Sequence, residues 1–257
     1  MGTALVVEND PTDDVRRLGD WLTGGGLDLR VCRPHAGDPL PAALEDFVAL
    51  VVLGGEQHAY PDAAGAPGAP WFPGLESLLR KAVRHRVPTL AICLGAQLLA
   101  VAHAGTVERS TAGPEIGPGL VARRDAAVGD PLFAAVPFAP DVIHWHHDEI
   151  TELPAGAVLM AASPRFAHQA FRLGDRAWGL QFHIECDTAM VADWAAANPA
   201  LLADLDYPAD ALVAAADAVM DDLTEAWQPF AYRFAQLALG RHPGDAGPRR
   251  TLPLLGG

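Results

Sequence analysis

The chain has 257 residues, 50% of them hydrophobic and 19% charged, and its 18 Lys and Arg against 32 Asp and Glu give a formal net charge of −14 at pH 7. This composition excludes wholesale disorder, and the acidic balance argues against a protein that binds nucleic acid through a basic face. At about 150 residues per domain, the length fits one large domain with an appendage or two small domains.

Three isolated cysteines, Cys32, Cys93 and Cys186, form neither a disulfide framework nor a paired metal-binding signature, which favours a reducing compartment. The first residues lack the basic start and the long apolar stretch of a signal peptide. The longest nearly apolar run, residues 90–105, is shorter than a membrane span. We therefore expect a cytoplasmic protein that binds neither membranes nor nucleic acid.

Short apolar runs alternate with helix-like segments over the first hundred residues. This alternation is typical of βαβ units, in which helices cover a parallel sheet. The run VALVVL at 48–53 is apolar on both faces, as a buried parallel strand is. We expect strands at 3–7, 27–32, 48–53 and 88–93, a helix from the capping residues at 9–13 to the glycines at 24–26, and a helix at 75–86.

After Gly105 the pattern changes to short strand-like runs at 119–123, 142–146, 158–162, 167–172 and 178–183. Their close spacing predicts antiparallel hairpins that extend the same sheet. From Thr188 the chain turns helical, and between residues 220 and 237 large apolar residues recur at steps of three and four, which marks one helix face. We divide the chain into a domain at 1–200, a helical extension packed on it at 201–240, and a mobile Gly- and Pro-rich tail at 241–257.

Cys93 lies where the strand expected at 88–93 meets a helix-like segment. Small residues flank it at Ala91 and Gly95, which lets the chain turn sharply from strand to helix. A helix N-terminus offers free N–H groups and a partial positive charge, and both favour a thiolate. The segment therefore predicts a nucleophile, with a buried structural cysteine as the alternative.

His183 and Glu185 are two residues apart in the segment QFHIE. In a strand, such residues point to the same face, so the two side chains would enter one cavity together. A histidine that is oriented by a carboxylate and lies beside a cysteine forms the cysteine version of a catalytic triad. The alternative is a core histidine beside a surface glutamate.

Gly54 and Gly55 directly follow the strand expected at 48–53. Paired glycines at a strand end permit a positive φ and let a backbone N–H point outward. The amides of Gly55 and Leu94 would together form an oxyanion hole, which stabilises negative charge on an attacked carbonyl oxygen. A plain turn is the alternative, because two adjacent glycines are common.

Taken together, these segments resemble the class I glutamine amidotransferase family. A GG loop after one strand, CLGAQ after the next parallel strand and QFHIE further along follow that family's order. HWHHDEITELPAGAVLMAAS is similar to the family's segment before its histidine strand, and HQAFRLGDRAWGLQFHIE is similar to its QAF…G.R.WG.QFHPE stretch. The resemblance spans residues 3–195 and points to stand-alone proteins similar to the amidotransferase domain of GMP synthase.

The resemblance implies the fold as well as the roles of single residues. It implies an α/β fold, a flavodoxin-like three-layer sandwich with a mostly parallel central sheet, an antiparallel extension and additional C-terminal helices. The domain at 1–200 would be the amidotransferase-like domain. The implied roles are Cys93 as nucleophile, His183 as general base and acid, Glu185 as orienting carboxylate, Gly55 and Leu94 as oxyanion hole, and Gln97, His146 and Trp145 as substrate-binding residues.

Four positions depart from the family's usual pattern. Ala91 replaces a frequent glycine and is still small, and Ile184 replaces the proline of QFHPE, which loosens the expected geometry between the histidine and the glutamate. Glu56 replaces a proline after the two glycines and brings a carboxylate to the pocket mouth. His147 replaces a glycine. None of these changes removes a catalytic group.

The segment at 144–148, HWHHD, also has the residue types of a zinc site. His144 and His146 would share a strand face, with Asp148 as a further ligand. A metal site needs more ligands and supporting contacts than this spacing supplies, and the resemblance already explains the segment. We therefore predict no metal ion and no organic cofactor.

The reaction implied by the resemblance is hydrolysis of a γ-glutamyl amide, glutamine to glutamate and ammonia, through a γ-glutamyl thioester. The sequence has no GxxxxGK[ST] phosphate loop and no visible second catalytic module. Three interpretations remain open. They are a glutaminase that delivers ammonia to a separate synthetase or other acceptor subunit, a stand-alone γ-glutamyl peptidase or hydrolase that acts on small conjugates, and a non-catalytic binding or regulatory member of the fold.

Overall fold

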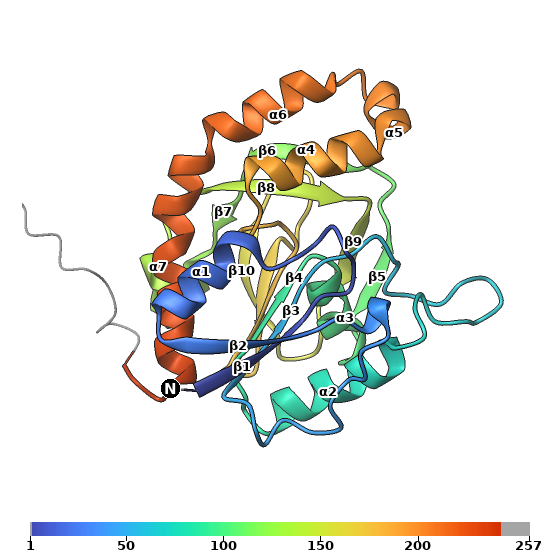
Figure 1. Cartoon of the computed structure of the whole chain (residues 1–257). Helices are drawn as coiled ribbons and strands as arrows, with labels where there is room; N and C mark the ends of the chain where they lie inside the picture. Colours follow the sequence, from blue (N-terminus) through green and yellow to red (C-terminus); the bar gives the residue numbers. More distant parts are fainter. Residues whose placement is uncertain (1, 243–257) are drawn as a thin grey trace, which may run out of the picture.

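A central eight-stranded sheet organises the computed structural model, which describes residues 2–242 (Figure 1). Neighbouring strands are parallel from β2 to β12 and antiparallel from β12 to β7, which confirms the mostly parallel sheet with an antiparallel extension. In spatial order the strands are β2 (Leu27–Cys32), β1 (Gly2–Val7), β3 (Ala49–Val52), β4 (Thr89–Ile92), β12 (Ala177–Leu180), β11 (Ala170–Leu173), β10 (Val158–Ala162) and β7 (Ala122–Arg123).

Two hydrophobic layers cover the two faces of this sheet. Successive side chains of a strand point to opposite faces, so Val6 enters one layer while Leu5 and Val7 enter the other. The first layer holds the buried faces of α1 (Arg16–Gly24) and α7 (Met220–Ala238), and the second holds those of α2 (Phe72–Arg84) and α3 (Leu94–Val101). This three-layer α/β arrangement confirms the flavodoxin-like fold.

Two further strand pairs stand apart from the large sheet. β5 (Thr106–Arg109) pairs with β9 (Asp148–Glu152), and β6 (Glu115–Leu120) pairs with β8 (Asp141–His146). The prediction that the runs at 119–123 and 142–146 extend the large sheet was therefore wrong for β6 and β8, and the β5–β9 pair was not predicted. The strand expected at 119–123 is split between β6 and β7, and β6 carries Gly-Pro-Gly at 117–119, a sequence that suits exposed edges because proline cannot donate to a ladder.

The C-terminal helices pack against the sheet and its neighbours. They are α4 (Thr188–Ala197), α5 (Pro199–Asp204), α6 (Ala209–Ala218) and α7. α4 contacts α6, α6 contacts β6, and α7 contacts α1 (Figure 1). The large apolar side chains of α7, among them Trp227 and Phe230, belong to the same core cluster as the strands. The tail predicted from residue 241 lies outside the described residues except for its first two positions.

The helix expected from residues 9–13 begins later, at Arg16. Asp10 Oδ1 accepts hydrogen bonds from the Thr12 N–H at 3.0 Å and the Thr12 hydroxyl at 2.8 Å, and Asp14 Oδ1 accepts one from the Arg16 N–H at 3.1 Å. These local bonds hold the chain in turns instead of a first helical turn.

Three short 3₁₀ turns, Pro34–Ala36, Asp125–Gly129 and Phe133–Ala135, complete the connections. Within residues 2–242, no helix combines the length and the apolarity that a membrane crossing requires.

Candidate active site

Cys93 forms a sharp bend between β4 and α3 at the carboxyl end of the parallel strands. Its φ of 51° and ψ of −111° lie outside the regions that a non-glycine residue ordinarily adopts. The bend brings α3 so close to β3 that a Cβ on Gly95 would lie 2.2 Å from the Val52 carbonyl oxygen. Packing therefore requires the glycine at position 95, and the strained turn has the geometry of a nucleophile elbow.

His183 and Glu185 form a buried pair. His183 Nδ1 lies 2.6 Å from Glu185 Oε1, and the Ile184 N–H donates to Glu185 Oε2 at 2.9 Å. A proline at position 184 would lack that N–H, so Ile184 adds a bond to the carboxylate instead of loosening the pair. The expected strand geometry was wrong: β12 ends at Leu180, and a turn brings the side chains together, with the His183 N–H bonded to the Ile143 carbonyl at 2.8 Å.

The charge state of His183 depends on both of its neighbours. Burial lowers the pKa of the His183 imidazole, but the Glu185 carboxylate and the Cys93 side chain outweigh burial and raise the pKa well above its usual value of 6.5. The second ring nitrogen, Nε2, finds no hydrogen-bond partner of ordinary geometry within residues 2–242. The structure therefore brings the side chains of Cys93, His183 and Glu185 together, and the raised pKa favours the protonated imidazole.

Gly54 and Gly55 form the loop after β3, where neighbouring atoms leave no room for a side chain. Neither has a positive φ, so that part of the expectation was wrong. A Cβ on Gly54 would lie 2.4 Å from Asp13 Oδ2, and a Cβ on Gly55 would lie 3.0 Å from Leu94 Cδ2. Gly55 therefore lies against the start of α3, where Leu94, as the first helical residue, has an N–H without an intrahelical partner.

A cavity opens above Cys93. Gln97, on the first turn of α3, points into it and donates from Nε2 to the Asp148 carbonyl and to Gln181 Oε1, both at 3.3 Å. Trp145 and His146, from β8, also line the cavity, as the resemblance implied. The complete lining is Asp13, Gly55, Glu56, Gln57, His58, Cys93, Gln97, Trp145, His146, His147, Asp148, Trp194 and Asn198.

Several site residues were missed by sequence reasoning. Asp13 accepts a bond from Trp194 Nε1 at 2.9 Å, and burial raises the pKa of its carboxyl to about 7, against the opposing charge of His183. Gln181 donates from Nε2 to the Cys93 sulfur at 3.8 Å. Both residues follow strands that end at the carboxyl edge of the sheet, which is the usual place for ligands in open α/β folds and the signal that would have found them.

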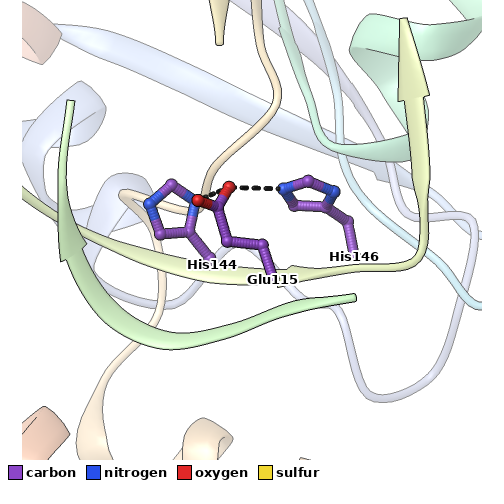
Figure 2. A group of neighbouring side chains, drawn as sticks. All are labelled: Glu115, His144 and His146. Atoms are coloured by element: carbon purple, nitrogen blue, oxygen red, sulfur yellow. Dashed lines mark hydrogen bonds and ion pairs between the residues drawn. The ribbon is translucent and has the colours of Figure 1, made fainter. Parts of the chain in front are cut away.

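The histidine-rich segment divides into two groups that the sequence had merged. Asp148 lies with His58, whose Nδ1 is 2.6 Å from Asp148 Oδ2, and with the Tyr60 hydroxyl at 3.2 Å. His144 and His146 instead face Glu115 of β6 (Figure 2). Burial lowers the pKa of His144 to about 4, although Glu115 acts in the opposite direction.

Comparisons with known proteins agree with this geometry. Residues 45–189, more than half of the chain, match the family described as glutamine amidotransferase class-I. YfeJ, a glutamine amidotransferase-like protein of Salmonella typhimurium, is 30% identical over 167 residues, which are 64% of this chain and 68% of that protein. A solved glutamine amidotransferase from Methylobacillus flagellatus superimposes with a TM-score of 0.81 and 29% identity, over 98% of this chain and 99% of that one.

Two other relatives have named activities. Gamma-glutamyl peptidase 4 of Arabidopsis thaliana is 29% identical over 58% of this chain and 58% of that protein. A glutamine-hydrolysing GMP synthase of Christiangramia forsetii is 30% identical over 60% of this chain, but the match spans only 28% of the synthase. The predicted resemblance to the GMP synthase amidotransferase domain is confirmed, whereas these relatives divide between peptidase and synthase.

Proposed function

The chain belongs to the class I glutamine amidotransferase family, and from that premise we propose that it hydrolyses a γ-glutamyl amide through a cysteine-bound thioester. The observation that carries the proposal is the position of His183, between the Glu185 carboxylate at 2.6 Å and the side chain of Cys93. A thiolate stabilised beside an imidazolium is the reactive form of a catalytic cysteine.

The proposed reaction has two halves. The Cys93 sulfur attacks the side-chain carbonyl, and the backbone N–H groups of Gly55 and Leu94 bind the oxyanion, each worth about 3 kcal/mol in comparable sites. The His183 imidazolium gives its proton to the departing ammonia, which leaves a γ-glutamyl thioester. His183 then takes a proton from water, which attacks the thioester and releases glutamate, while Glu185 keeps the imidazole oriented.

Substrate binding is assigned to Gln97, Trp145 and His146, because all three line the cavity above Cys93. The Gln97 amide is fixed by the Asp148 carbonyl and Gln181, so its remaining polar groups are held in place before substrate arrives. None of these steps requires a metal ion or an organic cofactor.

One observation favours a stand-alone hydrolase over a glutaminase that docks on a synthetase. A partner-dependent enzyme would present an apolar docking surface around the cavity mouth. Among residues 2–242 the exposed large apolar side chains are Leu120, Val128, Phe138 and Leu205, and none of them lines the cavity. The mouth instead carries polar side chains, Glu56, Gln57, His58 and His147, beside which the leaving group of a γ-glutamyl conjugate would lie.

The test is trapping with a glutamine analogue that carries an electrophilic ketone, followed by peptide mass spectrometry. We expect one adduct on the peptide that contains Cys93 and none in the Cys93→Ala variant. Competition by a panel of γ-glutamyl amides and dipeptides then ranks the acyl donors, with protection by dipeptides favouring the peptidase. Adducts on Cys32 or Cys186 instead of Cys93 would refute the proposal.

A further inference from the structure

Glu115, His144 and His146 form a cluster, and of these three residues only His146 also lines the cavity of the proposed hydrolysis (Figure 2). In the β6–β8 ladder Glu115 lies opposite His146, and the two histidines are two residues apart on β8 and share one face. Their ligand-type atoms all lie within 4.8 Å of one another. Both histidines are 3% exposed, whereas the Glu115 side chain is 13% exposed, so the two imidazoles are the shielded part of the cluster.

The hydrogen bond on the far side of His146 fixes its tautomer. Its Nδ1 lies 3.0 Å from the Asp148 backbone carbonyl, which can only accept, so Nδ1 carries the hydrogen. A neutral His146 then presents a lone pair at Nε2, and this atom lies 3.1 Å from Glu115 Oε2. Two lone pairs that face each other need a cation between them, either a proton or a metal ion.

His144 supplies a second, independent observation. Its Nδ1 is buried, points at the same Glu115 oxygen from 3.2 Å, and has no hydrogen bond of acceptable geometry to any described residue. Gln169, also buried beside the carboxylate, has an Oε1 that finds no partner in residues 2–242. Buried polar atoms without partners are costly, and a bound ion is one of the standard ways in which they are satisfied.

We propose that Glu115 Oε2, His144 Nδ1 and His146 Nε2 bind one divalent zinc-type metal ion. Zinc takes imidazole and carboxylate ligands, and bonds of about 2.1 Å separate the ligand atoms of a tetrahedral site by about 3.4 Å. The two separations that involve Glu115 Oε2, 3.1 and 3.2 Å, match such edges. Three protein ligands leave a fourth position for water.

Supporting contacts of the kind that metal sites require surround these ligands. The Asp148 carbonyl orients His146, as an outer carbonyl usually orients a metal-bound histidine. Gln169 Nε2 donates to Glu115 Oε2 at 2.6 Å, and the Ser163 hydroxyl donates to Oε1 at 3.3 Å. The sequence suggested Asp148 as the third ligand, but its carboxylate is bonded to His58 and Tyr60.

The ion would join β6 to β8 at one wall of the active-site cavity. β8 carries Trp145 and His146 of that wall, and its Ile143 pairs with the backbone of His183. We therefore assign the ion a stabilising role: it holds this wall, and with it the ring of His146, and takes no part in the bond-making steps of the proposed hydrolysis.

The test is Zn²⁺ titration against a chromophoric chelator, in the Cys93→Ala background so that the thiolate cannot compete as a ligand. We expect one ion per chain, and at least tenfold weaker binding in Glu115→Gln and in His144→Gln. His85→Gln, which removes an exposed histidine at the end of α2, is the matched control and should bind as the parent does. Thermal unfolding should show Zn²⁺ stabilising the parent and control more than the two ligand variants.

Far-ultraviolet circular dichroism checks that each variant is folded, and the two ligand variants serve as alternatives if one is not. Two results would overturn the proposal. Absence of Zn²⁺ binding in the folded parent would mean that a proton occupies the gap between Glu115 and His146. Binding that Glu115→Gln and His144→Gln leave unchanged would mean that the metal is held elsewhere on the chain.

Discussion

Replacement of Glu185 by glutamine tests the triad most informatively, because the change removes a charge but keeps the shape. Both carboxylate oxygens accept hydrogen bonds, Oε1 from His183 and Oε2 from the Ile184 N–H. An amide has one oxygen, so its NH₂ must face one of these two donors. If it faces Ile184, a buried donor is left unpaired, at a cost of about 1–3 kcal/mol of folding free energy.

If the NH₂ faces His183, it forces the tautomer with a proton on Nε2, and the base can no longer accept a proton. In either orientation the imidazolium loses its counter-charge. We therefore expect kcat to fall by about 10²–10⁴, the range found for general acid–base catalysis and triad carboxylates. This loss corresponds to about 3–5 kcal/mol of activation free energy. KM should change much less, since Glu185 is absent from the cavity lining drawn from the described residues.

The assay is steady-state release of ammonia from glutamine, or of the amine from the best γ-glutamyl donor, across a pH series. Loss of the Glu185 charge lowers the pKa of His183, so the alkaline limb of the profile should move to lower pH. Glu108→Gln, which changes an exposed residue on β5, is the matched control. A Glu185→Gln enzyme within threefold of wild-type kcat, or one whose KM rises as much as kcat falls, would refute the orienting role.

Three further predictions follow from the same geometry. Cys93→Ser should abolish turnover while circular dichroism and the melting temperature stay close to wild type. Gly95→Ala should destabilise the fold by about 3 kcal/mol in urea unfolding, because the new Cβ meets the Val52 carbonyl. Asp13 has a pKa raised to about 7 by burial, so the folded chain binds its proton more tightly than the unfolded chain and stability falls as pH rises from about 4 to 7. In Asp13→Asn, the free energy of unfolding should therefore fall by about 4 kcal/mol less over this pH range than it does in wild type. Urea unfolding of both proteins at pH 4, 5.5 and 7.5 measures the difference. An equal fall in the two proteins would contradict the raised pKa of Asp13.

The parallel half of the fold was readable from the sequence because its signals are local. The run at 48–53 is apolar on both faces because helices cover both sides of β3, and position 95 is a glycine because α3 lies against the Val52 carbonyl. Such positions admit few other residue types, so pattern and structure agree.

The pairing of later strands depends on contacts that no local pattern encodes. The run at 119–123 has the composition of one strand. In the structure, however, its residues up to Leu120 belong to β6 and its last two residues form β7, and these two strands lie in different sheets. Glu115 shows the same limit at the level of a site, since only the β6–β8 register brings it to His144 and His146. The contact between the side chains of His183 and Glu185 was predicted correctly, but for the wrong reason. The two residues were expected to lie on one strand, whereas β12 ends before them and a turn brings them together.

The central claim is that Cys93 carries the acyl group during turnover, and rapid acid quenching followed by intact-protein and peptide mass spectrometry tests it directly. During steady-state turnover, we predict a mass increase of one γ-glutamyl group on the peptide that contains Cys93. Hydroxylamine should remove it, as it removes thioesters. Sustained turnover by a Cys93→Ala protein, or a γ-glutamyl group found on any other residue, would contradict the account.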